Sequence, residues 1–162
     1  GANPEAAQET PVPQSEKYSW DWFQQPDAQP VEGQAHIELT TAERPLMLTE
    51  SENEEKPYVW SILLFAQETN GVSFTMDKVT EVYFNNEKLP MQTAEMTANE
   101  IEWYWYTTRL EAGGMTSYAT DRPADGGIGC GVAVEGKDDN GNELTFKLYS
   151  LSYTGIEQKA GA

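Results

Sequence analysis

The sequence predicts an all-β protein that folds as an antiparallel β-sandwich. Short runs in which apolar and polar side chains alternate recur along the chain, which is the pattern of half-buried strands. Asn70-Gly71 and Asn140-Gly141 separate such runs, and Asn-Gly is typical of tight β-hairpin turns. Helical patterns are scarce. The one candidate helix, at 89–99, contains a proline and fits a loop equally well. Strands linked by hairpins, with few helices, favour a sandwich.

The chain of 162 residues is long enough for one domain with its own core. Residues 1–17 are rich in Pro, Glu, Gln and Ala, and they are predicted to be a disordered acidic leader or tether. The single folded domain is predicted over 18–157, and residues 158–162 are predicted to be a flexible C-terminal tail.

The first half of the domain contains three predicted strand regions. Apolar and polar residues alternate over 35–41, which indicates a half-buried strand. The run at 58–65 carries large apolar side chains on both faces, so it is predicted to be a central strand covered on both sides. The Asn-Gly turn at 69–72 predicts a hairpin whose return strand runs over 72–76, is interrupted at 77–78 and extends again over 79–84.

The aromatic run at 101–110 is predicted to be a strand. Side chains along an extended chain point alternately to opposite faces, so Trp103 and Trp105 are expected in the core. Their expected neighbours there are Trp60, Phe74 and Phe146. The other face of this strand carries three large or charged side chains: Glu102, Tyr104 and Tyr106.

The last part of the domain is predicted to contain a long loop and a second hairpin. Residues 119–131 include a proline and four glycines, which predicts an irregular connection. Alternation resumes at 131–136, the second Asn-Gly turn lies at 137–142, and the final strand extends over 144–153.

The order of these elements resembles immunoglobulin-like domains found on bacterial surface proteins. The resemblance covers residues 35–155 and is architectural. The Cys-Trp-Cys pattern of true immunoglobulin domains is absent, since Trp60 has no disulfide to pack on. A closed eight-stranded β-barrel of the lipocalin type fits the same periodicity, so both architectures remain open from the sequence.

The charge and cysteine content exclude several classes of function. Lys and Arg total 10 against 27 Asp and Glu, and the net charge of −17 repels phosphate backbones and anionic lipids. Nucleic acid is therefore not expected as a partner. The single cysteine, Cys130, rules out an intramolecular disulfide and a zinc site made of thiolates. No apolar run approaches the roughly 18 residues that a transmembrane helix needs.

The leader resembles the tether behind the processed end of bacterial secreted or lipid-anchored proteins. This is a resemblance of composition over residues 1–16. It implies an extracytoplasmic location, secreted or lipid-anchored at the cell surface, with a signal segment or lipid anchor encoded upstream. The alternative is a cytoplasmic protein with a flexible acidic leader.

Four aromatic residues and one acid form the candidate ligand site. Flat rings with a polar edge stack on sugars and dock against proteins, and a carboxylate accepts hydrogen bonds from hydroxyl groups. The candidate residues are Trp20, Trp22, Tyr104, Tyr106 and Glu102. The alternative is structural, because rings near the leader could cover an otherwise open face of the sandwich.

Three further patterns lack the features of a catalytic or metal site. The acidic segment 138–143 lacks the Gly and Glu that a calcium loop needs, and a hairpin explains the same residues. Cys130 and His36 could pair as nucleophile and base, but no helix start follows Cys130 to activate the thiol. Glu100 and Glu102, on one side of the predicted strand, suit edge protection better than glycosidic cleavage. No catalytic residue, metal or cofactor is assigned.

These observations favour a non-enzymatic, extracytoplasmic module of a bacterial surface that serves binding or structural spacing, with a protein or glycan as partner. A carbohydrate-binding module that uses the candidate aromatic residues is the first alternative. A small hydrolase built on loop carboxylates is the second. Exposure of the four candidate rings is the property that separates a ligand site from packing.

Overall fold

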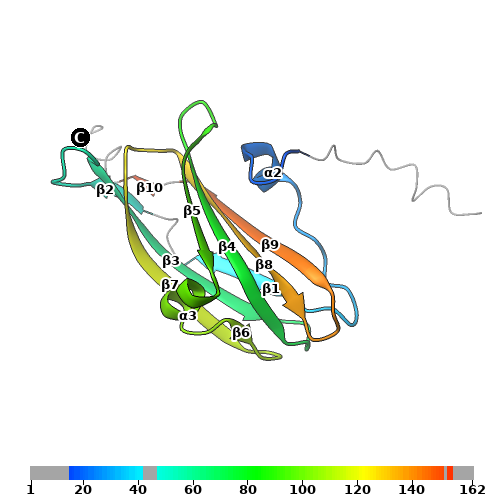
Figure 1. The fold of residues 1–162 in the computed structure, drawn as a ribbon. Helices are drawn as coiled ribbons and strands as arrows, with labels where there is room; N and C mark the ends of the chain where they lie inside the picture. Colours follow the sequence, from blue (N-terminus) through cyan, green and yellow to red (C-terminus); the bar gives the residue numbers. More distant parts are fainter. Residues whose placement is uncertain (1–14, 42–46, 152, 155–162) are drawn as a thin grey trace, which may run out of the picture.

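The computed structural model describes residues 15–41, 47–151 and 153–154 (Figure 1). Two β-sheets pack face to face and do not close into a barrel. The predicted antiparallel β-sandwich is therefore confirmed, and the barrel alternative is excluded. Most of the predicted leader and all of the predicted tail lie outside the described residues.

The first sheet is built around the long strand β3 (Tyr58–Glu68). On one edge β3 pairs antiparallel with β7 (Met115–Ala124) over nearly its whole length. On the other edge it pairs with β1 (Ile37–Thr41) and then with β2 (Met47–Glu50), both antiparallel. The short strand β10 (Tyr153–Thr154) adds to β2 in parallel.

The second sheet has the order β5-β4-β8-β9 and is antiparallel throughout. Its strands are β5 (Pro90–Thr97), β4 (Phe74–Phe84), β8 (Gly129–Asp138) and β9 (Glu143–Leu151). The two-residue strand β6 (Arg109–Leu110) pairs with the start of β4.

The inward faces of the two sheets form the main core. Trp60 packs on Tyr83 with ring centroids 5.4 Å apart, and Phe74 meets Phe146 edge to face at 5.5 Å. The core positions predicted for Trp60, Phe74 and Phe146 are confirmed. The outer face of β3 is different, since Leu63 is 40% exposed. The prediction that this strand is covered on both faces is wrong.

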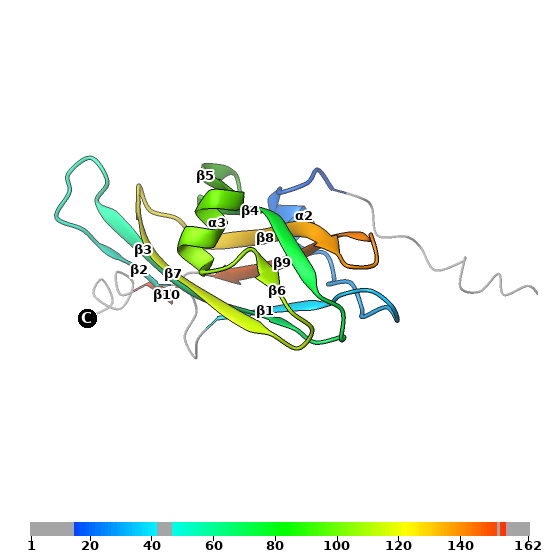
Figure 2. The same cartoon turned by 60° about the horizontal axis from the view of Figure 1, so that its bottom comes forward.

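Non-strand segments close the two open sides of the sandwich (Figures 1 and 2). The helix α3 (Ala98–Trp105) packs against β4, β5 and β7 on one side. On the other side, where β1 contacts β9, residues 26–30 line a cleft together with both strands. A second short helix, α2 (Trp20–Gln24), contacts β9 on the outer face of the second sheet.

Two predicted loops are strands in the structure. The segment at 89–99 is mostly β5, an edge strand whose proline stands at the first position, where no ladder hydrogen bond is lost. The predicted irregular connection at 119–131 is mostly strand, because β7 continues to Ala124 and β8 begins at Gly129. Pro123 is tolerated there because β7 pairs only with β3 and its other edge is free of ladder bonds.

Of the two hairpins predicted at Asn-Gly turns, one is present in the structure and the other is not. Gly141, with φ of 84°, turns between β8 and β9, so the second predicted hairpin is confirmed. Gly71, with φ of 83°, leads from β3 in one sheet to β4 in the other, so the first predicted hairpin is wrong. The left-handed glycine is needed in both turns, and the turn alone does not reveal which strands pair.

Among the described residues, neither helix is long and apolar enough to cross a membrane.

Candidate binding surface on helix α3

The aromatic run predicted as a strand belongs to the helix α3. A capping box opens the helix at Thr97, whose backbone N–H donates to the Glu100 carboxylate at 3.4 Å. The helix ends at Tyr106, which has the left-handed φ of 69°. The predicted strand is wrong, and with it the shared face of Glu100 and Glu102, because Glu100 serves the helix start.

One side of α3 is buried against the sandwich. Ile101 and Trp105 are four residues apart, lie on the same side of the helix, and are both fully buried. The Trp105 ring stacks on Tyr118 of β7 at 5.0 Å and 13°, and the Tyr104 ring meets the same tyrosine edge to face at 6.0 Å. Thr116 donates a hydrogen bond to the Trp105 carbonyl oxygen. This packing favours the helix over the extended conformation.

The opposite side of α3 presents two aromatic rings to solvent. Trp103 is 78% exposed, Tyr106 is 75% exposed, and Tyr104 is 36% exposed. The prediction that Trp103 lies in the core is wrong, since helical geometry turns it away from Trp105. The α3 aromatic surface, as we name it, consists of Glu102, Trp103 and Tyr106.

The α3 aromatic surface is acidic. Glu100 and Glu102 are both exposed, and α3 contains no Lys or Arg. On the strands that flank the helix, the Lys78 ammonium is already paired with acids, 3.6 Å from Glu135 and 3.9 Å from Glu95. Its hydrogen bond with Tyr18 and these neighbouring charges raise the pKa of Lys78 above its ordinary value. The surface therefore favours a cationic contact over an anionic one.

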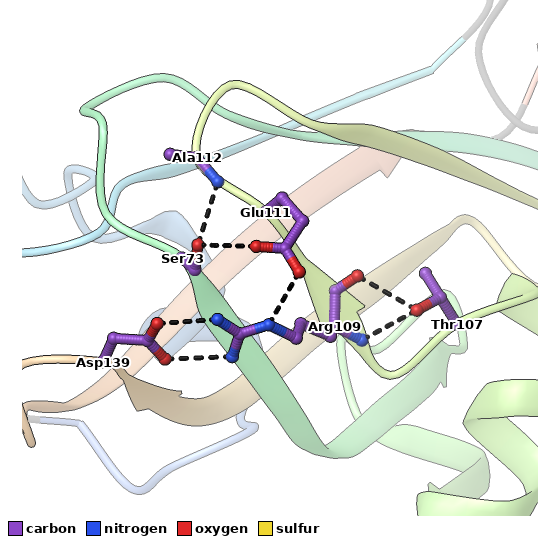
Figure 3. A network of polar contacts seen from close by, with 6 residues as sticks. All are labelled: Ser73, Thr107, Arg109, Glu111, Ala112 and Asp139. Carbon is purple, nitrogen blue, oxygen red and sulfur yellow. Dashed lines mark hydrogen bonds and ion pairs between the residues drawn. The ribbon is translucent and has the colours of Figure 1, made fainter.

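Arg109 anchors the chain just after α3 (Figure 3). Its guanidinium donates two hydrogen bonds to Asp139, at 2.9 and 2.6 Å, and one to Glu111 at 2.9 Å. Glu111 also accepts from the Ser73 hydroxyl at 3.1 Å, and the Thr107 hydroxyl bonds the backbone of Arg109. The bonds to Arg109 hold the pKa of both acids below their ordinary values. The network joins the end of α3 to the turns of both sheets.

A buried ionic cluster fixes Tyr118, the residue on which α3 packs. Glu81 of β4 is fully buried and accepts hydrogen bonds from the hydroxyls of Tyr83 at 2.5 Å and Tyr118 at 2.8 Å. Arg122 donates to the same carboxylate from Nε at 3.3 Å and Nη2 at 3.2 Å. Burial raises the pKa of both tyrosines, so they remain protonated donors. The support beneath α3 is therefore fixed by charge as well as by packing.

The candidate residues Trp20 and Trp22 lie elsewhere, on the outer face of the second sheet. Trp20 meets Tyr149 edge to face at 4.8 Å, and Trp22 meets Phe23 in the same way at 4.8 Å. Both indoles are half-buried. A Cβ built on Gly131 would come within 2.5 Å of the Phe23 ring. The absence of a side chain at Gly131 therefore leaves room for Phe23 to pack on the sheet. The structure does not bring these rings together with Glu102, Tyr104 and Tyr106.

The remaining candidates are occupied by structural contacts. Cys130 is buried beside Tyr83, and burial raises the pKa of its thiol well above the ordinary value. Asp138 accepts hydrogen bonds from the backbone N–H groups of Ala35, Asn140 and Asn142, so its oxygens order the hairpin. No group of three or more possible metal-ligating side chains lies within the described part of the chain.

Comparison with known proteins supports the fold alone. No protein-family model matches the sequence, and no curated protein matches it. A crystal structure from Bordetella pertussis, described as the ApaA protein, superposes with a TM-score of 0.55 at 11% identity. The match covers 76% of this chain and 98% of that one. An X-ray structure of a structural genomics target, with a TM-score of 0.48 and 8% identity, covers 77% of this chain and 91% of its own.

Proposed function

We propose that the protein is a non-enzymatic binding module that docks onto a protein partner through the α3 aromatic surface. The observation that carries this proposal is the exposure of Trp103 at 78% and Tyr106 at 75%. Trp and Tyr are enriched among the residues that dominate binding energy at protein interfaces. Burying a large apolar side chain at an interface contributes on the order of 2 kcal/mol.

The partner is a protein surface that presents Lys or Arg side chains. Glu100 and Glu102 supply carboxylates beside the two rings, and aromatic faces attract cations directly. The net charge of −17 adds long-range attraction for a basic partner and repulsion for an acidic one.

A non-enzymatic role is supported by how the reactive groups are used. The only thiol is buried with a raised pKa, which opposes nucleophilic attack. The buried carboxylates of Glu68, Glu81 and Asp138 are hydrogen-bonded to partners that order loops or the core.

The docking proposal is tested with an array of peptides that differ in Lys and Arg content. Wild-type protein is expected to bind Lys- or Arg-bearing peptides, and the Trp103→Ala variant is expected to bind the same peptides at least about tenfold more weakly, the equivalent of about 1.4 kcal/mol. Leu89→Ala is the matched control, because Leu89 is 54% exposed at the far end of β5 from α3. Equal binding by Trp103→Ala and wild type would refute the proposal.

The extracytoplasmic location is part of the proposal and is supported by the composition of residues 1–16. Cell fractionation of the native host, with an antibody against the folded domain, tests it. We expect the protein in the membrane or extracellular fraction. Recovery with cytoplasmic markers would contradict this location.

A further inference from the structure

A cleft of about 730 Å³ lies on the side of the sandwich opposite α3, where the edge strands β1 and β9 meet. Its size falls in the range of about 300 to 1,000 Å³ that is typical of small-ligand sites. Residues 26–30 form one wall, and side chains of β1 and β9, with Trp22, His36 and Thr69, form the rest. The cleft is separate from the α3 aromatic surface, because α3 contacts β4, β5 and β7.

The wall is joined to Lys147 of β9, whose ammonium donates to Asp27 at 3.1 Å, and the chain that follows the wall, residues 31–34, is held by side chains from both Asn-Gly turns. The Asn70 amide donates to the carbonyl oxygens of Val31 and Gln34, each at 2.9 Å. The Asn140 amide donates to the carbonyl oxygen of Gly33 at 2.7 Å. A ligand would therefore meet a site that is already ordered, so that little binding energy is lost in forming it.

The lining combines aromatic rings with polar side chains. Trp22 and Phe146 contribute apolar ring surface, and the His36 ring meets Phe146 edge to face at 5.5 Å. In the described part of the chain, the Glu38 carboxylate, the Thr145 hydroxyl and the ring nitrogens of His36 make no hydrogen bond. These groups offer both acceptors and donors around an apolar surface.

The charges of the cleft disfavour an anion, and they already place one cation, Lys147, beside the Trp22 ring. Glu38 and Asp27 disfavour an anion, and Lys147 does not compensate, since its ammonium is already 3.1 Å from Asp27. The same ammonium lies 5.9 Å from the centre of the Trp22 ring and disfavours a second cation there. A purely apolar ligand would leave the carboxylate and imidazole without partners on burial.

We infer that this cleft binds a neutral saccharide. One apolar face of the sugar ring packs on Trp22, and its hydroxyl groups donate to Glu38 and exchange hydrogen bonds with His36 and Thr145. A neutral saccharide can use both kinds of contact at once: its apolar face stacks on a flat ring, and its hydroxyl groups form hydrogen bonds with ionised or hydroxyl side chains. The inference is independent of the docking function proposed for α3.

The test is a neutral-glycan array, followed by affinity measurements on any glycan that binds. Wild-type protein is expected to bind at least one neutral glycan, and Glu38→Gln is expected to weaken that binding about tenfold. Glu38 is exposed, so the variant is expected to keep the thermal midpoint of the wild type, which is checked in the same experiment. Thr145→Val provides a second variant that removes one hydroxyl and retains the shape.

Trp103→Ala separates this site from the α3 aromatic surface. It is expected to leave glycan binding unchanged while it weakens peptide binding. The inference is overturned if no neutral glycan binds, if Glu38→Gln and Thr145→Val bind as tightly as wild type, or if Trp103→Ala removes glycan binding.

Discussion

Glu68 shows how one buried residue organises distant parts of the chain. Its side chain is fully buried at the end of β3 and accepts hydrogen bonds from four backbone N–H groups at 2.8 to 3.1 Å. The donors belong to the entry of β1, the β3–β4 turn and the loop before β7: His36, Asn70, Gly71 and Gly113. A carboxylate is suited to this position because both of its oxygens accept.

Glu68 is expected to make stability depend on pH. Burial raises the pKa of its carboxyl, but the backbone donors lower it more, so the folded pKa lies below the ordinary 4.5. A group with a depressed folded pKa stabilises the fold above the unfolded value, and this stability is lost as pH falls through the folded pKa. We therefore expect the thermal midpoint of the wild type to decrease as the pH is lowered below 4.5.

Replacing Glu68 by Gln is expected to cost about 2 kcal/mol at pH 7, since one acceptor oxygen is lost and its buried donors stay unpaired. The thermal midpoint of Glu68→Gln is expected to depend less on pH below 4.5 than that of the wild type. Glu54→Gln, in an exposed loop, is the control and is expected to follow the wild type. Identical acid profiles for wild type and Glu68→Gln would show that Glu68 does not carry this pH dependence.

At the scale of elements, α3 divides its aromatic residues between packing and exposure. Trp105→Ala removes a fully buried ring that stacks on Tyr118, and it is expected to cost about 3 to 5 kcal/mol. Trp103→Ala alters an exposed ring, and it is expected to change stability by less than about 0.5 kcal/mol. Urea unfolding of both variants measures the difference. Comparable losses of stability would contradict the orientation of the helix.

The packing of α2 on the outer face of the second sheet depends on Gly131. Gly131→Val is expected to cost about 1 to 3 kcal/mol, because the new side chain overlaps the Phe23 ring, 2.5 Å from the Cβ position. Phe23→Ala removes the ring that causes the overlap. The double variant is therefore expected to be more stable than the sum of the single losses predicts, which urea unfolding checks. Strict additivity would show that the two residues do not contact.

The sequence predicted most strands but not the helix that carries the α3 aromatic surface. β1 was predictable because a simple inward-facing alternation matches its burial, and β3 was located by its run of large apolar residues, although its buried residues lie on one face only. At 101–105 the alternation of apolar residues fits a strand, yet Ile101 and Trp105 also fit one side of a helix. The signal that separates the two is the capping box formed by Thr97 and Glu100.

The candidate site was predicted only in part, because its geometry depends on contacts between distant segments. Tyr106 is exposed as a ligand residue must be, whereas Trp103, the most exposed aromatic of α3, was assigned to the core. Trp20 and Trp22 lie on the outer face of the second sheet, away from α3. They pack there because Gly131 leaves space for the neighbouring Phe23 ring. Sheet membership is decided by pairing across the chain, which local sequence does not encode.

At the scale of the whole molecule, the sandwich presents two distinct surfaces on its two open sides. The α3 aromatic surface is exposed and acidic, whereas the cleft between β1 and β9 is lined by aromatic rings and polar side chains. The two have no residue in common, so each can be altered without the other. A net charge of −17 favours basic partners over acidic ones across the whole surface.

Long-range attraction of this kind makes binding to basic peptides sensitive to salt. Raising ionic strength from about 0.05 M to about 0.5 M shortens the screening distance and is expected to weaken peptide binding severalfold. Binding of a neutral glycan is expected to stay nearly constant over the same range. Surface plasmon resonance at both ionic strengths measures this, and salt-independent peptide binding would contradict the assigned role of charge.

The most direct test of the central claim compares wild type and Trp103→Ala for their affinity for the same Lys- or Arg-bearing peptide. The thermal midpoint of both proteins is measured alongside, to show that the variant is folded. We predict at least a tenfold loss of affinity in the variant, or about 1.4 kcal/mol, with an unchanged thermal midpoint. Equal affinities would contradict the claim that the outward face of α3 is the docking surface of this protein.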